Sequence, residues 1–267
     1  MVDRRFIDVD LSVPPEGHAT GLIEQPPAEL LASYQDLPWF DEICRDDMVP
    51  RSQWRDRAER VKAALRGTVA EIYSQGRTSA CVGFACAQAC ETTHNRRYGR
   101  RHRVPLSGMS VYDQIGRTLM SGAYIPDGVA FLQQAGPLPL QTAATAAKYA
   151  VTFPGLEYRW SRPAGWRDVA RLFRVTKAAK AQGADMVASA LIKGRAGIVG
   201  RDNHAIPYVL LDFNGSAPVA CYANSWSKDW GDAGFGYDSE RVFGGLVMYV
   251  ILEVAARPDL AVEAIAT

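Results

Sequence analysis

The sequence predicts an α+β protein in which most of the helices come before most of the strands. Up to about position 184, several stretches are rich in small residues or have an amphipathic pattern, and several of them end at a glycine, as helices do. From about Asp185 onward, short β-prone runs alternate with Gly, Asn, Asp and Pro. This order favours two segregated halves over a repeated βαβ unit.

Six stretches in the first part of the chain have a helical pattern. The clearest covers residues 81–99, where small and apolar residues dominate and Gly99 follows the end. Asp127 is predicted to be an N-cap, and Gly136 to end the same helix. The predicted helices are 28–37, 50–67, 81–99, 110–123, 127–136 and 165–184. Four predicted strands follow, at 186–192, 205–213, 218–226 and 245–254.

The composition limits the classes of protein to consider. The chain has 267 residues, of which 48% are hydrophobic, enough for a sizeable core in one or two domains. Its net charge of +1 gives no overall attraction to nucleic acid or to an anionic membrane. No run approaches the roughly 20 apolar residues of a membrane span. The first residues lack the apolar core of a signal peptide, which predicts a cytoplasmic protein or, if a phage encodes it, a virion-associated one.

Three of the five cysteines fall within ten positions, and they differ in context. Cys86 and Cys90 lie inside the predicted helix among alanines, which favours a place in the core. A second ligand pair, as structural zinc sites have, does not follow them, so no metal is expected. Cys81 lies where a polar loop meets the helix, and a thiol in the first turn feels the positive end of the helix dipole. Position therefore nominates Cys81 as a reactive thiolate, although a buried inert cysteine is an equal alternative at this point.

A nucleophilic thiol needs a histidine and a group that orients it. Of the four histidines, His94 and His102 flank an arginine-rich stretch and are expected to be solvated, and His18 lies among prolines. His204 instead begins a strongly β-prone run. Twenty residues later comes Asn224, whose amide oxygen could accept from the imidazole, with Trp226 close enough to cover the contact.

These segments resemble the papain-like (C1-type) cysteine peptidases. "SQGRTSACVGFA" resembles the active-site segment, with Gln75 six residues before Cys81, and "NHAIPYVLLDF" resembles the histidine segment. "ANSWSKDWGDAGFGY" resembles the asparagine segment. His204 lies 123 and Asn224 143 residues after Cys81, against about 130–150 in that family. The resemblance covers roughly residues 50–250 and suggests a divergent prokaryotic or phage-like member.

The chain also departs from the family pattern. Val82 replaces an aromatic residue beside the nucleophile, and Thr78 replaces a cysteine that secreted members use in a disulfide. Asn203 stands where many members carry an acid before the histidine. By the same resemblance, Gly122 would line the substrate cleft, and Asn203 would be a second substrate-binding residue.

The resemblance implies a two-lobed fold with the active-site cleft between a helical left lobe and an antiparallel, barrel-like β lobe. The catalytic domain would span residues 51–250, with the lobes at about 51–145 and 146–250. Residues 1–50 would be an N-terminal extension, serving as a pro-segment, anchor or packing arm, and residues 251–267 a C-terminal tail.

The implied activity is that of a cysteine endopeptidase (thiol protease) acting on peptide or protein substrates without a cofactor. Cys81 would attack the carbonyl, and Gln75 with the Cys81 backbone N–H would form the oxyanion hole. His204 would transfer protons, Asn224 would orient it, and Trp226 would shield their contact from water.

Three other functions stay open on the sequence. The first is a catalytically silent papain-like module that binds partner proteins, for example in a virus particle or another assembly. The second is a transferase, because an amine can attack an acyl-enzyme in place of water. The third is nucleic-acid binding through the arginine-rich loop 96–103, which the neutral net charge makes the weakest of the three.

Overall fold

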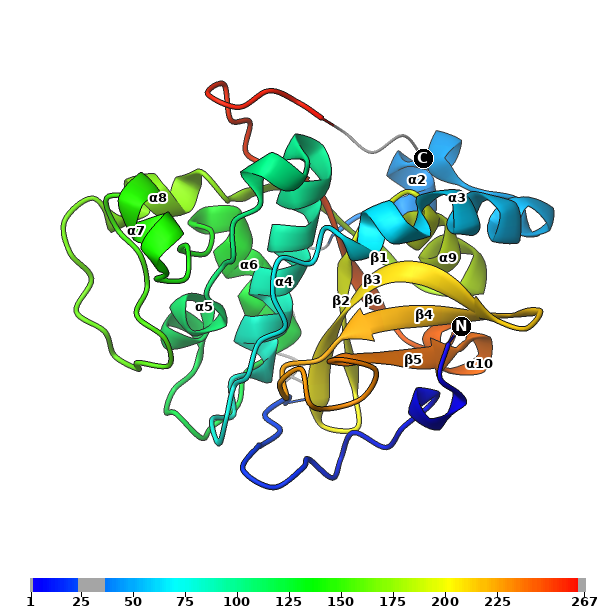
Figure 1. The fold of residues 1–267 in the computed structure, drawn as a ribbon, viewed down its shortest axis with the longest axis horizontal. Helices are drawn as coiled ribbons and strands as arrows, with labels where there is room; N and C mark the ends of the chain where they lie inside the picture. Colours follow the sequence, from blue (N-terminus) through cyan, green and yellow to red (C-terminus); the bar gives the residue numbers. More distant parts are fainter. Residues whose placement is uncertain (1, 24–36, 264–267) are drawn as a thin grey trace.

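The structure is a computed structural model of the chain, and it describes residues 2–23 and 37–263. The α+β prediction is confirmed: helices gather on one side of the molecule and an antiparallel sheet on the other (Figure 1). We call α4 to α8 the helical half, and the sheet with α2, α3, α9 and α10 the β half. The helices are α2 (Phe40–Ile43), α3 (Trp54–Arg66), α4 (Cys81–Tyr98), α5 (Gly108–Ile115), α6 (Ile125–Gln134), α7 (Ala143–Lys148), α8 (Trp166–Arg171), α9 (Ala184–Ile192) and α10 (Glu240–Phe243).

Six strands form one sheet in the order β1-β6-β2-β3-β4-β5, and every neighbouring pair is antiparallel. The strands are β1 (Val175–Ala181), β2 (Gly197–Arg201), β3 (His204–Asn214), β4 (Ala217–Ala223), β5 (Phe235–Ser239) and β6 (Met248–Val254). β2 and β3 are joined by only Asp202 and Asn203, both in the left-handed region with φ of 53° and 59°. Two consecutive left-handed residues form the tight hairpin turn whose twist matches that of the flanking strands. Apart from glycine, Asn and Asp are the residue types that adopt this conformation most readily. The turn makes His204 the first residue of β3, opposite Arg201.

The helix α4 runs along the boundary between the two halves (Figure 1). Sixteen of its eighteen residues are buried, as expected for a helix covered on all sides. Its backbone also approaches α5 closely, because a Cβ on Gly83 would lie 2.6 Å from the carbonyl oxygen of Gly108. The predicted helix at 81–99 is therefore confirmed. Every residue of its first turn is buried.

Two predicted elements are wrong. The stretch 165–184 is helical only over α8, and its second half forms the edge strand β1, paired with β6. The run 186–192 lies in the helix α9 instead of a strand. Short apolar or alanine-rich runs fit either structure, and here tertiary pairing decides between them.

Other predicted elements are corrected at their ends. The predicted helix 110–123 stops at Ile115, and Tyr124 takes the N-cap position of α6 in place of Asp127. The predicted helix 28–37 falls almost wholly outside the described residues. The last predicted strand, 245–254, begins later, at Met248, and ends at Val254 as predicted, so it extends into the segment expected to be a tail.

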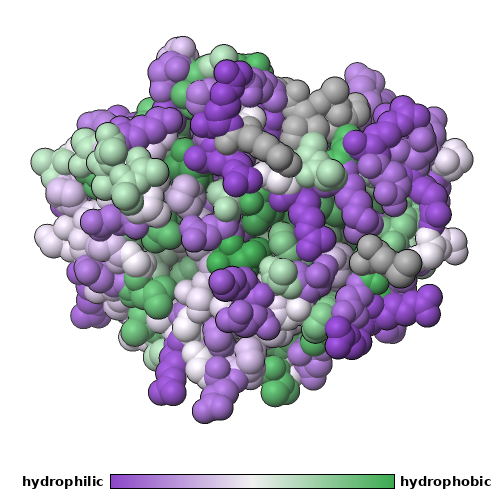
Figure 2. Space-filling view, viewed as in Figure 1, coloured by the Kyte–Doolittle hydropathy of each residue, from purple (hydrophilic) through white to green (hydrophobic). Residues whose placement is uncertain are grey.

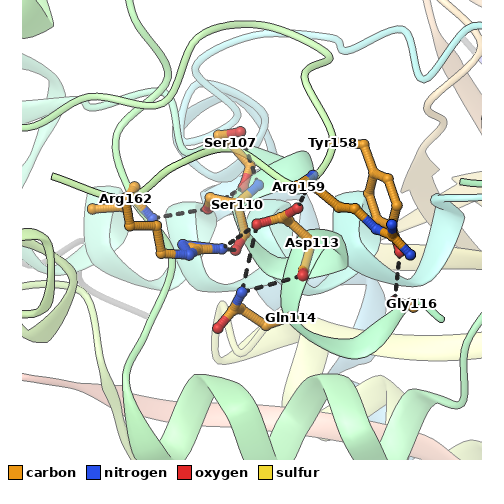
Figure 3. A network of polar contacts seen from close by, with 9 residues as sticks. Ser107, Ser110, Asp113, Gln114, Gly116, Tyr158, Arg159 and Arg162 are labelled. Carbon is orange, nitrogen blue, oxygen red and sulfur yellow. Dashed lines mark hydrogen bonds and ion pairs between the residues drawn. The ribbon is translucent and has the colours of Figure 1, made fainter. Parts of the chain in front are cut away.

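The long connection between α7 and α8 is pinned to α5 by a buried polar network (Figure 3). Arg162 pairs with Asp113 at 2.9 Å, and the two side chains are only 9% and 3% exposed. Arg162 also donates to the carbonyl of Ser110, and Tyr158 to that of Gly116. These bonds fix the connection against the helical half without any regular secondary structure.

An N-terminal arm, residues 2–23, runs along the lower edge of the β half toward the boundary (Figure 1). Its first part is built into the sheet side: Asp8 donates its N–H to the carbonyl of Tyr237, and Leu11 is fully buried. Arg201 donates to the carbonyl of Val9 and also pairs with the buried Asp238 at 2.7 Å.

The visible surface is mostly hydrophilic, with smaller hydrophobic patches between the polar side chains (Figure 2). None of the helices in the described part of the chain is long and apolar enough to cross a membrane.

Candidate active site

Cys81 is the first residue of α4, directly after the loop that begins at Gly76. Its side chain is fully buried, and the nearby backbones of Ala205 and Gly21 act to lower the pKa of its thiol. Burial nevertheless raises the pKa of Cys81 to about 11. Loss of hydration outweighs these backbone contributions and favours a neutral thiol in this buried arrangement, so the thiolate expected at this helix start stays a prediction.

His204 is the residue before Ala205 in β3, and the backbone of Ala205 is close enough to the Cys81 thiol to lower its pKa. The Nε2 atom of His204 makes a hydrogen bond of 2.9 Å to Oδ1 of Asn224, and Asn224 comes directly after β4. This bond leaves Nδ1 as the ring nitrogen that could exchange a proton with the thiol, and Nδ1 has no hydrogen-bond partner among the described residues. Burial lowers the pKa of His204 to about 4, so the imidazole is neutral here.

Trp226 covers the histidine as the sequence suggested it could. Its ring stacks on His204 with the ring centres 4.4 Å apart and the planes 25° apart, and its side chain is 1% exposed. The ring of Trp230 packs edge-on against the ring of Trp226, with the ring centres 5.6 Å apart. The bond between His204 and Asn224 is thus excluded from water.

Gln75 is positioned by the segment that carries Asn224. The strand-like pair Ser74 and Trp226 joins the two segments, and the N–H of Gln75 donates to the carbonyl of Ser225 at 2.9 Å. The hydroxyl of Ser225 then donates to Oε1 of Gln75 at 2.5 Å. This contact fixes the amide so that its nitrogen points the opposite way, toward Ala19.

A segment that the sequence analysis did not single out crosses this site. We call residues 18–23 the strap. The carbonyl oxygen of Ala19 accepts from Nε2 of Gln75 at 3.0 Å and from Nε1 of Trp226 at 3.2 Å. The strap also carries Gly21, whose backbone is close enough to the Cys81 thiol to lower its pKa.

The two residues predicted to line the cleft lie against the strap. The carbonyl of Asn203 accepts the N–H groups of Gly21 and Leu22, at 3.2 and 3.0 Å. Gly122 has a φ of 69°, and a Cβ there would lie 2.3 Å from the carbonyl oxygen of Gly21. Both positions are therefore within reach of a chain that follows the path of the strap.

The remaining cysteines of α4 and His94 belong to the interior. Burial raises the pKa of Cys86 and of Cys90, and the Cys90 thiol donates to the carbonyl of Phe173. The expectation that His94 is solvated is wrong: it is fully buried between Tyr98 and Phe173. No group of three or more His, Cys, Asp or Glu side chains within 2–23 and 37–263 is arranged to hold a metal ion.

The fold was compared with known proteins. No family model matches the chain, and no curated protein sequence does. Solved structures of papain-like cysteine proteases match at 16% identity. Procathepsin L2 from Tenebrio molitor has a TM-score of 0.60, covering 91% of this chain and 80% of its own. Procathepsin B S9 from Trypanosoma congolense has 0.56, with 88% and 87% covered, and xylellain from Xylella fastidiosa has 0.54, with 90% and 97% covered.

At this identity the likeness concerns the backbone, and it agrees with the order of helices and antiparallel strands described above. The chain therefore has the papain-like α+β fold, with Cys81, His204, Asn224 and Gln75 gathered where its helical half meets its β half.

Proposed function

We propose that this chain is a cysteine peptidase that cleaves peptide bonds through a covalent acyl-enzyme. The observation that carries the proposal is the 2.9 Å bond between His204 and Asn224, which Trp226 shields, at the start of the strand whose Ala205 backbone acts on the Cys81 thiol. A neutral amide that orients a histidine next to a cysteine is an arrangement suited to activating a thiol.

The reaction follows from these positions. The Cys81 thiol passes its proton to Nδ1 of His204, and the sulfur attacks the substrate carbonyl carbon. Nε2 of Gln75 and the backbone N–H of Cys81 stabilise the resulting oxyanion. The C–N bond then breaks as His204 gives its proton to the leaving amine.

The second half of the reaction uses the same groups. His204 removes a proton from water, which attacks the thioester carbonyl. The acid product leaves, and the sulfur of Cys81 recovers its proton from His204. In the structure, the carbonyl of Ala19 already accepts from Gln75, which supports the role of this amide as a carbonyl-binding group.

One observation favours the alternative of a catalytically silent module. Cys81 and His204 are both fully buried, and burial moves their pKa values to about 11 and about 4, which gives a neutral pair at pH 7. Such a module would bind a protein partner in a larger assembly without turning it over.

Peptide cleavage by matched variants tests the two functions. We expect the wild-type chain to cleave members of a peptide mixture, detected by mass spectrometry, and Cys81→Ala to lose at least about a thousandfold in rate. Cys86→Ala, on the same helix, is the control and should keep its activity. Cleavage that persists in Cys81→Ala would contradict the mechanism. A chain that neither turns over peptide nor forms an epoxide adduct at Cys81 would be the silent module, provided that the Gly21→Ala variant, whose added methyl would meet the Ser79 backbone, behaves in the same way.

A further inference from the structure

Residues 68–75, which we call the approach segment, lead along α4 toward Gln75. Three buried side chains of α4, each at most 1% exposed, hold the backbone of this segment. Their spacing of three and four residues places them on one face of the helix. The contacts are those of Asn95, which donates to the carbonyl of Thr68 (2.8 Å), Glu91, which accepts from the N–H of Ala70 (2.8 Å), and Gln88, which donates to the carbonyl of Glu71 (2.7 Å). The approach segment therefore runs toward the start of α4.

Tyr73 continues this series of contacts, and it does so with its side chain. Its hydroxyl donates to the carboxyl of Glu91, and its ring packs edge-on against the ring of Phe84, with the ring centres 6.0 Å apart. Phe84 follows Cys81 by three residues in α4. Tyr73 therefore joins the approach segment to the part of α4 that carries the proposed nucleophile.

The backbone of the same residue is bonded to the segment that follows β4. The carbonyl of Tyr73 accepts the N–H of Ser227 at 3.0 Å, and the N–H of Gln75 donates to the carbonyl of Ser225 at 2.9 Å. The residues between these two bonds pair in the antiparallel sense. Two residues before Gln75, Tyr73 is thus joined to the helical half by its side chain and to the β half by its main chain.

The proposed oxyanion hole needs such a link, because its two donors come from different segments. The N–H of Cys81 belongs to α4, whereas the Gln75 side chain is bonded to Ser225, Thr78 and Ala19. Within residues 2–23 and 37–263, no hydrogen bond of that side chain goes to α4 itself. A donor displaced by about an ångström loses much of its effect on the transition state, so the contacts of Tyr73 with α4 bear on the reaction.

The carboxyl of Glu91 is surrounded by hydrogen-bond donors. It is fully buried and accepts from the N–H of Ala70, the hydroxyl of Tyr73 and the N–H of Leu106. Burial raises the pKa of Glu91 to about 7, because a charged carboxylate loses its hydration there. With three donors on one carboxyl, Glu91 keeps two partners when the Tyr73 hydroxyl is removed.

We propose that Tyr73, held by Glu91, is a positioning residue for Gln75 and thereby sets the rate of the chemical step. This inference rests on the proposed peptidase function. Tyr73 acts through the amide of Gln75 and touches neither the substrate nor the reacting atoms.

Tyr73→Phe tests the proposal, because it removes the hydroxyl and keeps the ring beside Phe84. We expect kcat for a cleaved peptide to fall about 5- to 20-fold and KM to change less than about twofold, since only a transition-state donor is displaced. Tyr98→Phe is the matched control. Tyr98 also lies on α4 and is 1% exposed, but its hydroxyl accepts from Arg257, away from the approach segment. Its removal should leave kcat unchanged, and an equal loss in both variants would contradict the proposal.

A double-mutant cycle with Gln75→Ala shows whether Tyr73 acts through Gln75. Gln75→Ala alone should lower kcat by about 100-fold or more, the usual effect of losing one oxyanion donor. In that background Tyr73→Phe should lower kcat by less than about twofold further, because the amide that it positions is gone. The same loss in both backgrounds, or an unchanged kcat in Tyr73→Phe, overturns the proposal.

Glu91→Gln changes the other member of the pair. An amide offers one acceptor oxygen to the three donors where the carboxylate offers two, so we expect the same fall in kcat and the same lack of addition with Gln75→Ala. If Tyr73→Phe and Glu91→Gln both fail to melt cooperatively, the contact serves the fold as a whole and the proposal is wrong.

Hydrogen exchange separates this inference from the peptidase function. In Tyr73→Phe the amides of Gln75 and Ser227 should exchange at least about tenfold faster than in wild type, whereas the amide of Ile251, bonded to Ala196, should not change. This acceleration in a chain that has no turnover supports the positioning of Gln75 and removes the peptidase. Turnover with unchanged exchange, or with equal losses in both backgrounds, supports the peptidase and removes the positioning role.

Discussion

The imidazole of His204 is oriented by an amide, and this partner adds no charge to the site. The bond to Asn224 raises the pKa of the ring, but burial, the largest effect, and the charge of Arg201 lower it to about 4. The orientation of His204 is thus built into the protein, whereas its charge depends on hydration. Uncovering Cys81 and His204 would relieve the burial that keeps both neutral.

The Asn224→Ala substitution should lower kcat by about 10- to 100-fold, because the ring of His204 loses the contact that orients it. KM should change little, since Asn224 does not touch the substrate in the proposed mechanism. Asn214→Ala, at the other end of β3, is the control and should leave kcat unchanged. Steady-state kinetics at matched folding stability check the prediction, and equal kcat values for the two variants would contradict it.

Among elements, α4 shows how one helix serves chemistry at its start and packing along its length. Its small residues allow the close approach to α5, and the same residues made it recognisable in the sequence. The stretch 165–184 was less readable, because its alanines and lysines favour a helix while pairing with β6 makes the second half a strand. Local pattern identifies a long helix such as α4 well, and it identifies short apolar runs such as 186–192 and the sheet edge at β1 poorly.

The burial of His94 inside α4 predicts a pH-dependent contribution to stability. Burial lowers the pKa of His94 from its ordinary 6.5 to about 4 in the folded chain. The unfolded chain therefore binds the proton first, so the stability contributed by neutral His94 is complete above pH 6.5 and is lost as the pH falls toward 4. The loss is on the order of 3 kcal/mol.

The His94→Gln variant, which cannot titrate at this position, isolates that contribution. Urea unfolding should show wild type to be the more stable protein at pH 7.5, with a difference that shrinks as the pH falls from 6.5 to 4. Other groups, such as His204 and Glu91, titrate in both proteins and cancel in the difference. If the difference in the free energy of unfolding between the two proteins is constant across this range, His94 takes up no proton on unfolding and its pKa is not lowered in the folded chain.

For the whole molecule, the N-terminal arm links the sheet, the turn before His204 and the strap. Arg201 joins the carbonyl of Val9 to the buried Asp238, and Asp202 accepts the N–H of Leu11. The arm is thus part of the folded core as well as a cover for the site.

Leu11→Ala should therefore lower the free energy of unfolding by about 2 to 5 kcal/mol, the usual effect of emptying a fully buried leucine site. Val13→Ala, two residues along and exposed, should change it by less than about 0.5 kcal/mol. Denaturant midpoints measure both. Similar midpoints for the two variants would mean that the arm does not contribute to the cooperative core.

The α+β class, the helix that begins at Cys81, and the order of Gln75, Cys81, His204 and Asn224 can all be predicted from the amino-acid sequence. These features are local, because each depends on spacing and residue type within a short segment. The path of residues 18–23 across the site, and the burial that shifts the pKa values of Cys81 and His204, depend on how distant segments pack together. The contacts of Ala19 with Gln75 and Trp226 span 56 and 207 residues. No local pattern encodes such contacts, and the pKa of a buried group follows from what the whole chain packs around it.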